Sequence, residues 1–81
     1  MQVMFYGRLG EQIGRSVEIA VPEGGCSVAE LRRSIASDHP HAAEAILGSH
    51  VRASVGDVIV PEDRLLMPNE TVEFFPPVSG G

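Results

Sequence analysis

The stretch SVAELRRSIASD, residues 27–38, carries both the start signal and the periodicity of one well-defined helix. Ser27 and Glu30 stand at the S-x-x-E spacing of a capping box, in which two free N–H groups at a helix start are satisfied reciprocally. The apolar residues recur at helical intervals and form one stripe: Val28, Leu31 and Ile35. The charged residues lie off this stripe: Arg32, Arg33 and Asp38. The stretch therefore predicts an amphipathic helix that packs one face against a core.

Two strand patterns precede this helix. QVMFY, residues 2–6, is rich in residues that favour strands, and SVEIAV, residues 16–21, alternates between polar and apolar positions. Between them, residues 8–13 predict a short helical turn that ends at Gly14. We therefore expect the two strands to form a hairpin with a long connection.

Further elements follow the helix. Residues 40–48 start with a proline and end with a glycine, which predicts a second, shorter helix. Residues 51–60 predict two strands joined at Gly56 and Asp57, because a tight hairpin turn needs residues that tolerate left-handed dihedral angles. TVEFF, residues 71–75, alternates as a last strand.

The order of these elements indicates the fold class. Two strands, one main helix and further strands predict an α+β fold in which a mixed sheet packs on a single helix, the β-grasp arrangement. The chain has 81 residues, 43% of them hydrophobic, which is enough for one compact core. We expect a β-grasp domain over residues 1–75 and an extended C-terminal tail over residues 76–81.

Composition and charge exclude several classes of function. Six basic residues against eleven acidic ones give a net charge of −5, the opposite of what a phosphate-binding surface needs, so no nucleic-acid partner is expected. The start MQVMFYGRLG lacks a signal-peptide pattern, and no apolar run approaches the length of a membrane span. A cytoplasmic protein without a membrane partner is expected. All six basic residues are arginine, which reflects compositional bias or protects an activated acyl group from amines.

The metal-binding and thiol chemistry that this sequence offers is limited. Cys26 is the only cysteine, so neither an internal disulfide nor a cysteine-based zinc or iron–sulfur site is predicted. Cys26 precedes the predicted helix, where the helix dipole lowers a thiol pKa, so it is either a sulfur carrier or a small packed residue. The histidines have no helical i, i+4 spacing and predict no metal site: His39, His41 and His50.

The chain ends with FFPPVSGG, residues 74–81. Strand alternation places Phe75 on the face opposite Phe74. Four consecutive residues then form an apolar ledge that suits a partner protein: Phe75, Pro76, Pro77 and Val78. The alternative is that Phe75 packs against the edge of its own sheet. The two prolines favour extended polyproline geometry and direct the chain away from the sheet.

The last three residues suit a narrow catalytic pocket. Ser79 and Gly80 are small, and a site can close tightly around a glycine that has no Cβ. The terminal carboxylate of Gly81 is ionised at neutral pH and is a nucleophile toward the α-phosphate of ATP. The resulting acyl-adenylate is open to attack by sulfur or nitrogen nucleophiles. We therefore expect Gly81 to be the reacting residue.

These motifs resemble those of a known family. FFPPVSGG at residues 74–81, VMFYGRLGEQIG at residues 3–14 and SVAELR at residues 27–32 are similar to segments of the MoaD/ThiS family of ubiquitin-like proteins. Within that family, the Phe-Phe-Pro-Pro lead resembles the small, sulfur-carrying subunit of molybdopterin synthase. The resemblance extends over essentially the whole chain.

The resemblance implies a role in molybdenum cofactor biosynthesis. An E1-like activating enzyme would use ATP to adenylate Gly81, and a sulfur donor protein would convert the adenylate to a thiocarboxylate. The large synthase subunit would then accept the tail and pass the sulfur to a pterin precursor. In this family the synthase is a heterotetramer whose large subunit supplies most catalytic groups. The chain would bind no cofactor and would not be catalytic alone.

Other functions use the same tail chemistry. A ubiquitin-like modifier would be conjugated through Gly81 to lysines, and a sulfur carrier of thiamin synthesis or tRNA thiolation would also carry a thiocarboxylate. An acyl carrier protein, by contrast, would need a helical bundle with an Asp-Ser-Leu attachment site, and the sequence has neither.

Overall fold

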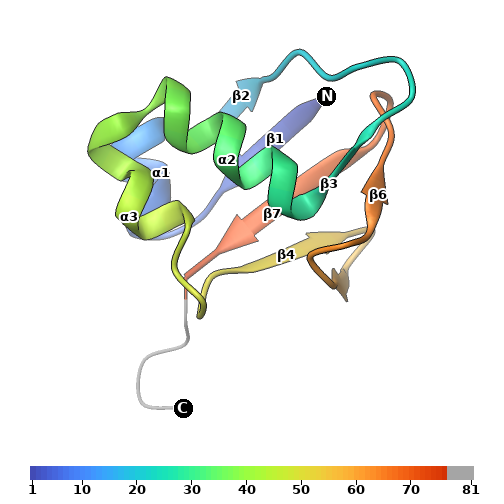
Figure 1. Ribbon diagram of the computed structural model, residues 1–81. Helices are drawn as coiled ribbons and strands as arrows, with labels where there is room; N and C mark the ends of the chain where they lie inside the picture. Colours follow the sequence, from blue (N-terminus) through green and yellow to red (C-terminus); the bar gives the residue numbers. More distant parts are fainter. Residues whose placement is uncertain (77–81) are drawn as a thin grey trace.

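The computed structural model describes residues 1–76, and its elements follow the predicted order (Figure 1). The N-terminal part contains β1 (Gln2–Phe5), α1 (Arg8–Ile13), β2 (Ser16–Glu18) and β3 (Cys26–Ser27). The helical part contains α2 (Val28–Asp38), the 3₁₀ helix η1 (Pro40–Ala42) and α3 (Ala43–Ile46). The C-terminal part contains β4 (Arg52–Val55), β5 (Val58–Val60), β6 (Leu65–Leu66) and β7 (Thr71–Phe75).

Five strands form a mixed sheet in the order β2-β1-β7-β4-β5. β1 and β7 are parallel, and the other neighbours are antiparallel. The main helix α2 crosses one face of this sheet, as Figure 1 shows. This arrangement confirms the predicted β-grasp fold. A second, two-stranded sheet of β3 and β6, which the sequence did not indicate, lies beside the start of α2.

The predicted capping box begins α2. The amide of Glu30 donates to Ser27 Oγ at 3.1 Å, and the amide of Ser27 donates to Glu30 Oε1 at 2.8 Å. Chiefly because it accepts this bond from the backbone of Ser27, the pKa of the Glu30 carboxyl lies below its usual value. Two carbonyl groups of the loop between β5 and β6 accept the next amides, from Val28 and Ala29. The free N–H groups at this helix end are therefore satisfied by the capping box and by the loop before β6.

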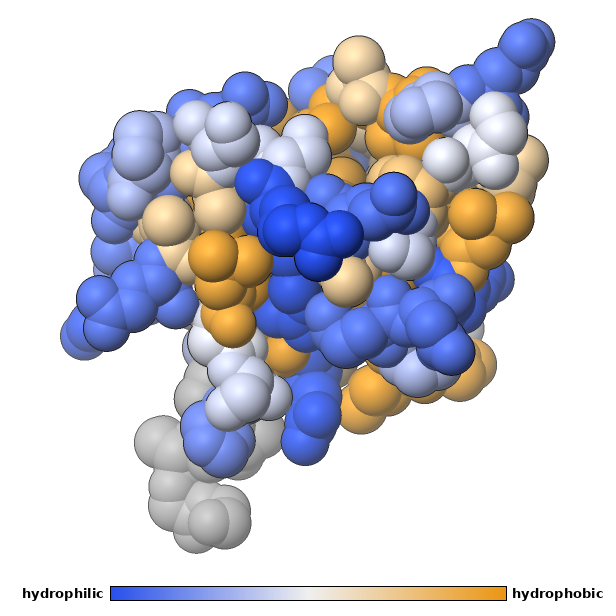
Figure 2. Space-filling model, in the orientation of Figure 1, coloured by the Kyte–Doolittle hydropathy of each residue, from blue (hydrophilic) through white to orange (hydrophobic). Residues whose placement is uncertain are grey.

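The core lies between α2 and the sheet. The predicted stripe of α2 is buried against the inner face, where Phe5 and Phe74 stack with ring centroids 5.9 Å apart and an interplanar angle of 13°. The opposite side of α2 is exposed, and Figure 2 shows a largely hydrophilic surface there. The exposed residues of that side are polar or charged: Arg33, Ser34, Ser37 and Asp38.

The two predicted turns form at the expected residues. Gly56 and Asp57 both have positive φ angles, of 56° and 66°, so β4 and β5 are joined by a tight hairpin turn. Gly14 has a φ of 128°, and its amide donates to the carbonyl of Gly10 at 2.9 Å, which ends α1 as predicted.

Three predicted elements differ in length. β1 ends at Phe5 rather than at residue 6. β2 ends at Glu18 rather than at residue 21, although Ile19 and Met1 still exchange two backbone hydrogen bonds. The predicted second helix over residues 40–48 is divided into η1 and α3, because Ala42 has non-helical dihedral angles of −110° and 5°. Alternation and helix periodicity gave the type of these elements, but tertiary contacts set where they end.

Arg32 is the residue whose position differs most from expectation. It lies off the apolar stripe, yet its residue exposure is only 6%. Its guanidinium donates to the carbonyls of Ile46, at 2.8 Å, and of Val51. It also pairs with the carboxylate of Glu62, with Nη2 at 2.9 Å from Oε2 and Nε at 2.8 Å from Oε1, and it lies 5.3 Å from the ring centroid of Phe74. Arg32 thus links α2 to the segments before β4 and after β5.

We expect Arg32→Met to lower the free energy of unfolding by about 2–4 kcal/mol, because it leaves two carbonyls and a carboxylate without their donor. Chemical denaturation followed by circular dichroism measures this loss. Arg33→Met is the matched control, since Arg33 is the exposed neighbour, and it should change stability by less than about 0.5 kcal/mol. Equal losses in the two variants would contradict a linking role for Arg32.

Candidate functional site

The C-terminal segment leaves the domain from the middle of the sheet. β7 lies between β1 and β4, so the chain beyond Phe75 emerges where β1 ends and β4 begins (Figure 1). Two contacts fix this point: the amide of Tyr6 donates to the carbonyl of Phe74 at 3.0 Å, and Arg52 is the register partner of Phe75. We call this end of the sheet the tail exit, formed by Tyr6, Arg52, Phe75 and Pro76.

Gly7 packs closely against Pro76 at the tail exit. A Cβ atom at Gly7 would lie 2.8 Å from Cγ of Pro76, closer than real Cβ contacts allow, and its φ of 61° is a conformation that glycine adopts most readily. The first proline after β7 therefore packs directly against the backbone that follows β1. This contact holds Pro76 in place at the tail exit.

The two phenylalanines of β7 lie on opposite faces, as alternation predicted. Phe74 has no exposed surface and stacks on Phe5, whereas Phe75 is half-buried on the outer face. Because β7 is an interior strand of the sheet, Phe75 does not pack against a sheet edge. It lies on the outer face between Tyr6 and Arg52, at the point where the tail leaves.

Tyr6 is held in place on the outer face by a carboxylate. Its hydroxyl donates to Glu73 Oε2 at 2.6 Å, and Ser54 Oγ donates to Glu73 Oε1 at 3.3 Å. The hydrogen bond to Glu73 raises the pKa of the Tyr6 phenol, and the charge of that carboxylate acts in the same direction. Tyr6 as a residue is 42% exposed, so its side chain is available to a partner while the bond to Glu73 fixes its orientation.

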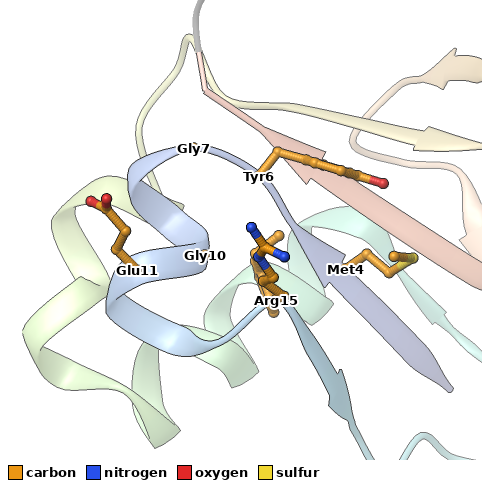
Figure 3. Close-up of a pocket in the computed structure, with 7 residues that line it drawn as sticks. Met4, Tyr6, Gly7, Gly10, Glu11 and Arg15 are labelled. Carbon is orange, nitrogen blue, oxygen red and sulfur yellow. The ribbon is translucent and has the colours of Figure 1, made fainter.

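A recess of about 790 Å³ lies beside Tyr6 (Figure 3). Met4 comes from β1 and Tyr6 directly follows it, Gly7 and Gly10 form one wall, and Arg15 comes from the segment before β2. In Figure 3, the guanidinium group of Arg15 lies near the ring of Tyr6, whereas the carboxylate of Glu11 points away. The recess therefore combines an aromatic ring with an exposed positive charge.

A second recess, of about 580 Å³, lies on the other side of α1 and is bordered by Pro76. His41 and His50 line it, and Nε2 of His41 lies 2.6 Å from the carbonyl oxygen of Gln12. His39 contacts His41 edge-on. Among residues 1–76, no group of three or more His, Cys, Asp or Glu side chains is placed to hold a metal ion.

Cys26 has the environment of a packed residue rather than of an activated thiol. It is half-buried in β3, opposite Leu66. Burial, and secondarily the charge of Glu30, raises the pKa of the thiol above its usual value. A raised pKa lowers the thiolate fraction at neutral pH, so the structure favours the structural interpretation of Cys26.

The sequence-predicted site lies partly outside the described residues. Phe75 and Pro76 are placed at the tail exit, whereas the other five predicted site residues are not described: Pro77, Val78, Ser79, Gly80 and Gly81. Sequence reasoning missed Tyr6 and Glu73 as parts of the site. Alternation within residues 2–6 indicates that Tyr6 faces outward, but its bond to a residue near the other end of the chain has no local signal.

Comparison with known proteins connects this geometry to a family. The model of the ThiS family matches residues 3–81. A Pyrococcus furiosus protein described as a candidate molybdopterin converting factor, subunit 1, is similar in structure, with a TM-score of 0.81, 28% identity and 95% of each chain covered. Comparison with curated protein sequences gives no significant match.

Two archaeal modifier proteins share the fold. The chain superposes on small archaeal modifier protein 1 of Haloferax volcanii with a TM-score of 0.82 and 22% identity, over 99% of this chain and 97% of that one. For the corresponding protein of Methanosarcina acetivorans, the TM-score is 0.73 and the identity 19%, over 99% and 94% of the two chains. In the part of the chain that the structure describes, no helix is long and apolar enough to cross a membrane.

The ionisation of Tyr6 tests the outer-face network directly, because Tyr6 is the only tyrosine and the chain has no tryptophan. We expect the phenol to titrate above its ordinary pKa of about 10, as measured by the ultraviolet absorbance of the phenolate. Glu73→Gln should lower this pKa, since the variant removes the negative charge that opposes ionisation. A titration that does not change in Glu73→Gln would show that the Tyr6–Glu73 bond is not formed in solution.

Proposed function

Because the chain belongs to the ThiS family, we propose that it is a sulfur carrier of molybdenum cofactor biosynthesis whose terminal residue, Gly81, becomes a thiocarboxylate. One observation carries the proposal: the family match extends through the final Gly-Gly, over residues 3–81. The Phe-Phe-Pro-Pro lead at residues 74–77 and the 28% identical Pyrococcus protein favour molybdopterin synthase over other sulfur-transfer pathways.

The proposed chemistry has two steps. The carboxylate oxygen of Gly81 attacks the α-phosphorus of ATP in the activating enzyme, pyrophosphate leaves, and an acyl-adenylate forms. Hydrosulfide delivered by the donor protein then attacks the acyl carbon and AMP leaves, which yields the thiocarboxylate without a change in oxidation state. Covalent activation of this kind divides one difficult transfer into two easier steps. The chain itself supplies the reacting terminus and no catalytic base.

The body of the domain supports this chemistry by presenting the tail. Gly7 and the end of β7 position Pro76, and the outer face beside the tail exit offers Tyr6 and Phe75 to a partner. We assign the ledge that begins at Phe75 and Pro76 and continues through Pro77 and Val78 to docking on the large synthase subunit. Ser79 and Gly80 would then carry Gly81 into the catalytic pocket.

A ubiquitin-like modifier is the second candidate, because the same acyl-adenylate yields an amide when an amine attacks it. The similarity to proteins named as archaeal modifiers concerns the fold and does not distinguish the two fates. The product distinguishes them: a sulfur carrier gains one sulfur in place of one oxygen, whereas a modifier appears in conjugates of higher mass.

Removing Gly81, or adding one residue after it, should abolish sulfur gain while leaving the fold intact. Intact-mass analysis after incubation with ATP, the activating enzyme and a sulfide source measures this. Gly24→Ala is the control, since a Cβ at Gly24 would meet no atom within 4 Å, and it should gain sulfur normally. Sulfur gain by either terminal variant would exclude the tail as the reacting element.

Phe75→Ala should weaken binding to the large synthase subunit by about 1–3 kcal/mol if the ring is a docking anchor. Isothermal titration calorimetry with the purified subunit measures the affinity. Leu65→Ala provides the control, because Leu65 is 54% exposed but belongs to the separate two-stranded sheet. If the two variants bind equally well, Phe75 is only a surface residue of the carrier.

A further inference from the structure

The arginines of this acidic chain fall into two groups. Two of them form ion pairs within the domain: Arg32 with Glu62, and Arg64 with Glu70 at 2.7 Å. Within residues 1–76, the other four are exposed and form no ion pair with a carboxylate: Arg8, Arg15, Arg33 and Arg52. Three of these four lie close to the tail exit, since Arg8 follows Gly7, Arg15 lines the recess of Tyr6, and Arg52 is paired with Phe75.

Arg15 and Arg52 lie on either side of the exposed Tyr6 and the half-buried Phe75. Arg52 shares the outer face with Phe75, because register partners on neighbouring strands point to the same face. On the other side, the carbonyl of Arg15 accepts the amide of Phe5 at 3.0 Å, and its side chain reaches the recess of Tyr6 (Figure 3). Tyr6, Phe75 and Arg52 therefore follow one another across the sheet, and Arg15 stands beside Phe5, one residue before Tyr6, with its side chain in the recess of Tyr6.

The spacing of this row follows from sheet geometry. Arg52 begins β4 and Phe75 ends β7, whereas Tyr6 follows β1 and Arg15 precedes β2. These four strands are neighbours in the sheet, where adjacent strands lie about 4.8 Å apart. The backbones of Arg15 and Arg52 are thus separated by about 15 Å, with an aromatic contact surface between them.

Nearby carboxylates do not neutralise the two arginines. Glu73 is engaged by the hydroxyl groups of Tyr6 and Ser54, and Glu11 lines the recess but points away from Arg15 in Figure 3. Neither carboxylate forms an ion pair with Arg15 or Arg52 among the interactions of the described residues. Within residues 1–76, both guanidinium groups are therefore open to a partner.

We propose that Arg15 and Arg52 are docking residues for the activating enzyme, which meets them with two carboxylates that flank an apolar patch. This inference rests on the proposed function, because it takes the enzyme that adenylates Gly81 as the partner. An acidic surface is repelled by a chain of net charge −5 except where arginines are exposed. The two arginines therefore orient the carrier so that the tail exit faces the enzyme, and Tyr6 and Phe75 fill the apolar patch.

Charge reversal tests this assignment in a steady-state adenylation assay. Wild type, Arg15→Glu, Arg52→Glu and the double variant are compared as substrates of the activating enzyme, with Arg33→Glu as the control of equal charge change. Arg33 is an exposed arginine on α2, on the other side of the domain from the outer face. We expect each reversal at the tail exit to raise KM about fivefold and the double variant about 20-fold, with kcat within about twofold.

Salt provides an independent readout. Raising the salt concentration should reduce kcat/KM of the wild type more steeply than that of the double variant, because exposed charge pairs are screened. Circular dichroism shows whether each glutamate variant is folded. If one is unfolded, Arg15→Gln and Arg52→Gln replace it in the test, because they remove the charge without reversing it. They should raise KM by less than the glutamate variants do.

Two outcomes would overturn the inference. If Arg15→Glu and Arg52→Glu behave like Arg33→Glu in KM and in salt dependence while the wild type is adenylated, the docking role is wrong and the sulfur-carrier proposal stands. If the wild type itself is not adenylated, both proposals fail together.

Discussion

The parallel pairing of β1 and β7 is the interaction on which the rest of this structure depends. Parallel neighbours need a crossover connection, and here nearly the whole chain, including α2, lies between the two strands. The pairing places the first and last strands side by side at the centre of the sheet and buries Phe5 against Phe74. Because β7 is the central strand, it has a neighbouring strand on each side, and Phe75 and Pro76 lie at the middle of this end of the sheet.

Arg32 contacts the inner face of this central strand, and the Tyr6–Glu73 pair lies on its outer face. On the inner face, Arg32 lies over the ring of Phe74 and holds the carbonyl of Val51, the residue before β4. On the outer face, Glu73 fixes the ring of Tyr6 beside Phe75. A contact surface whose side chains are already oriented loses less conformational entropy when a partner binds. The tail exit is thus preorganised by polar contacts on either side of β7.

The local features of this fold were predictable from sequence, and its tertiary polar contacts were not. The capping box of Ser27 and Glu30, the Gly56-Asp57 turn and the alternation in β7 all depend on residues close together in the chain, and the structure confirms them. Arg32 appeared as an ordinary charged residue off the stripe, because its partners are backbone carbonyls 14 and 19 residues away, to which no side-chain pattern points. The bond between Tyr6 and Glu73 was equally unpredictable from sequence, because the two residues are 67 positions apart. For the site, the tail motif predicts that Gly81 is the reacting residue, but it does not indicate the surface around the tail exit.

The exclusive use of arginine connects the proposed docking surface with the proposed chemistry. An acyl-adenylate reacts with any free amine in reach, and a lysine beside the tail exit would place such an amine near the activated carbonyl. The guanidinium group of arginine stays protonated at all physiological pH values and is a poor nucleophile, yet it binds carboxylates in a planar, two-point geometry. Arg15 and Arg52 can therefore supply the positive charge that docking requires without competing for the acyl group. One constraint then accounts for two features, the absence of lysine from the sequence and the arginines around the tail exit. The constraint is that a reactive terminus has to be presented beside a charged surface.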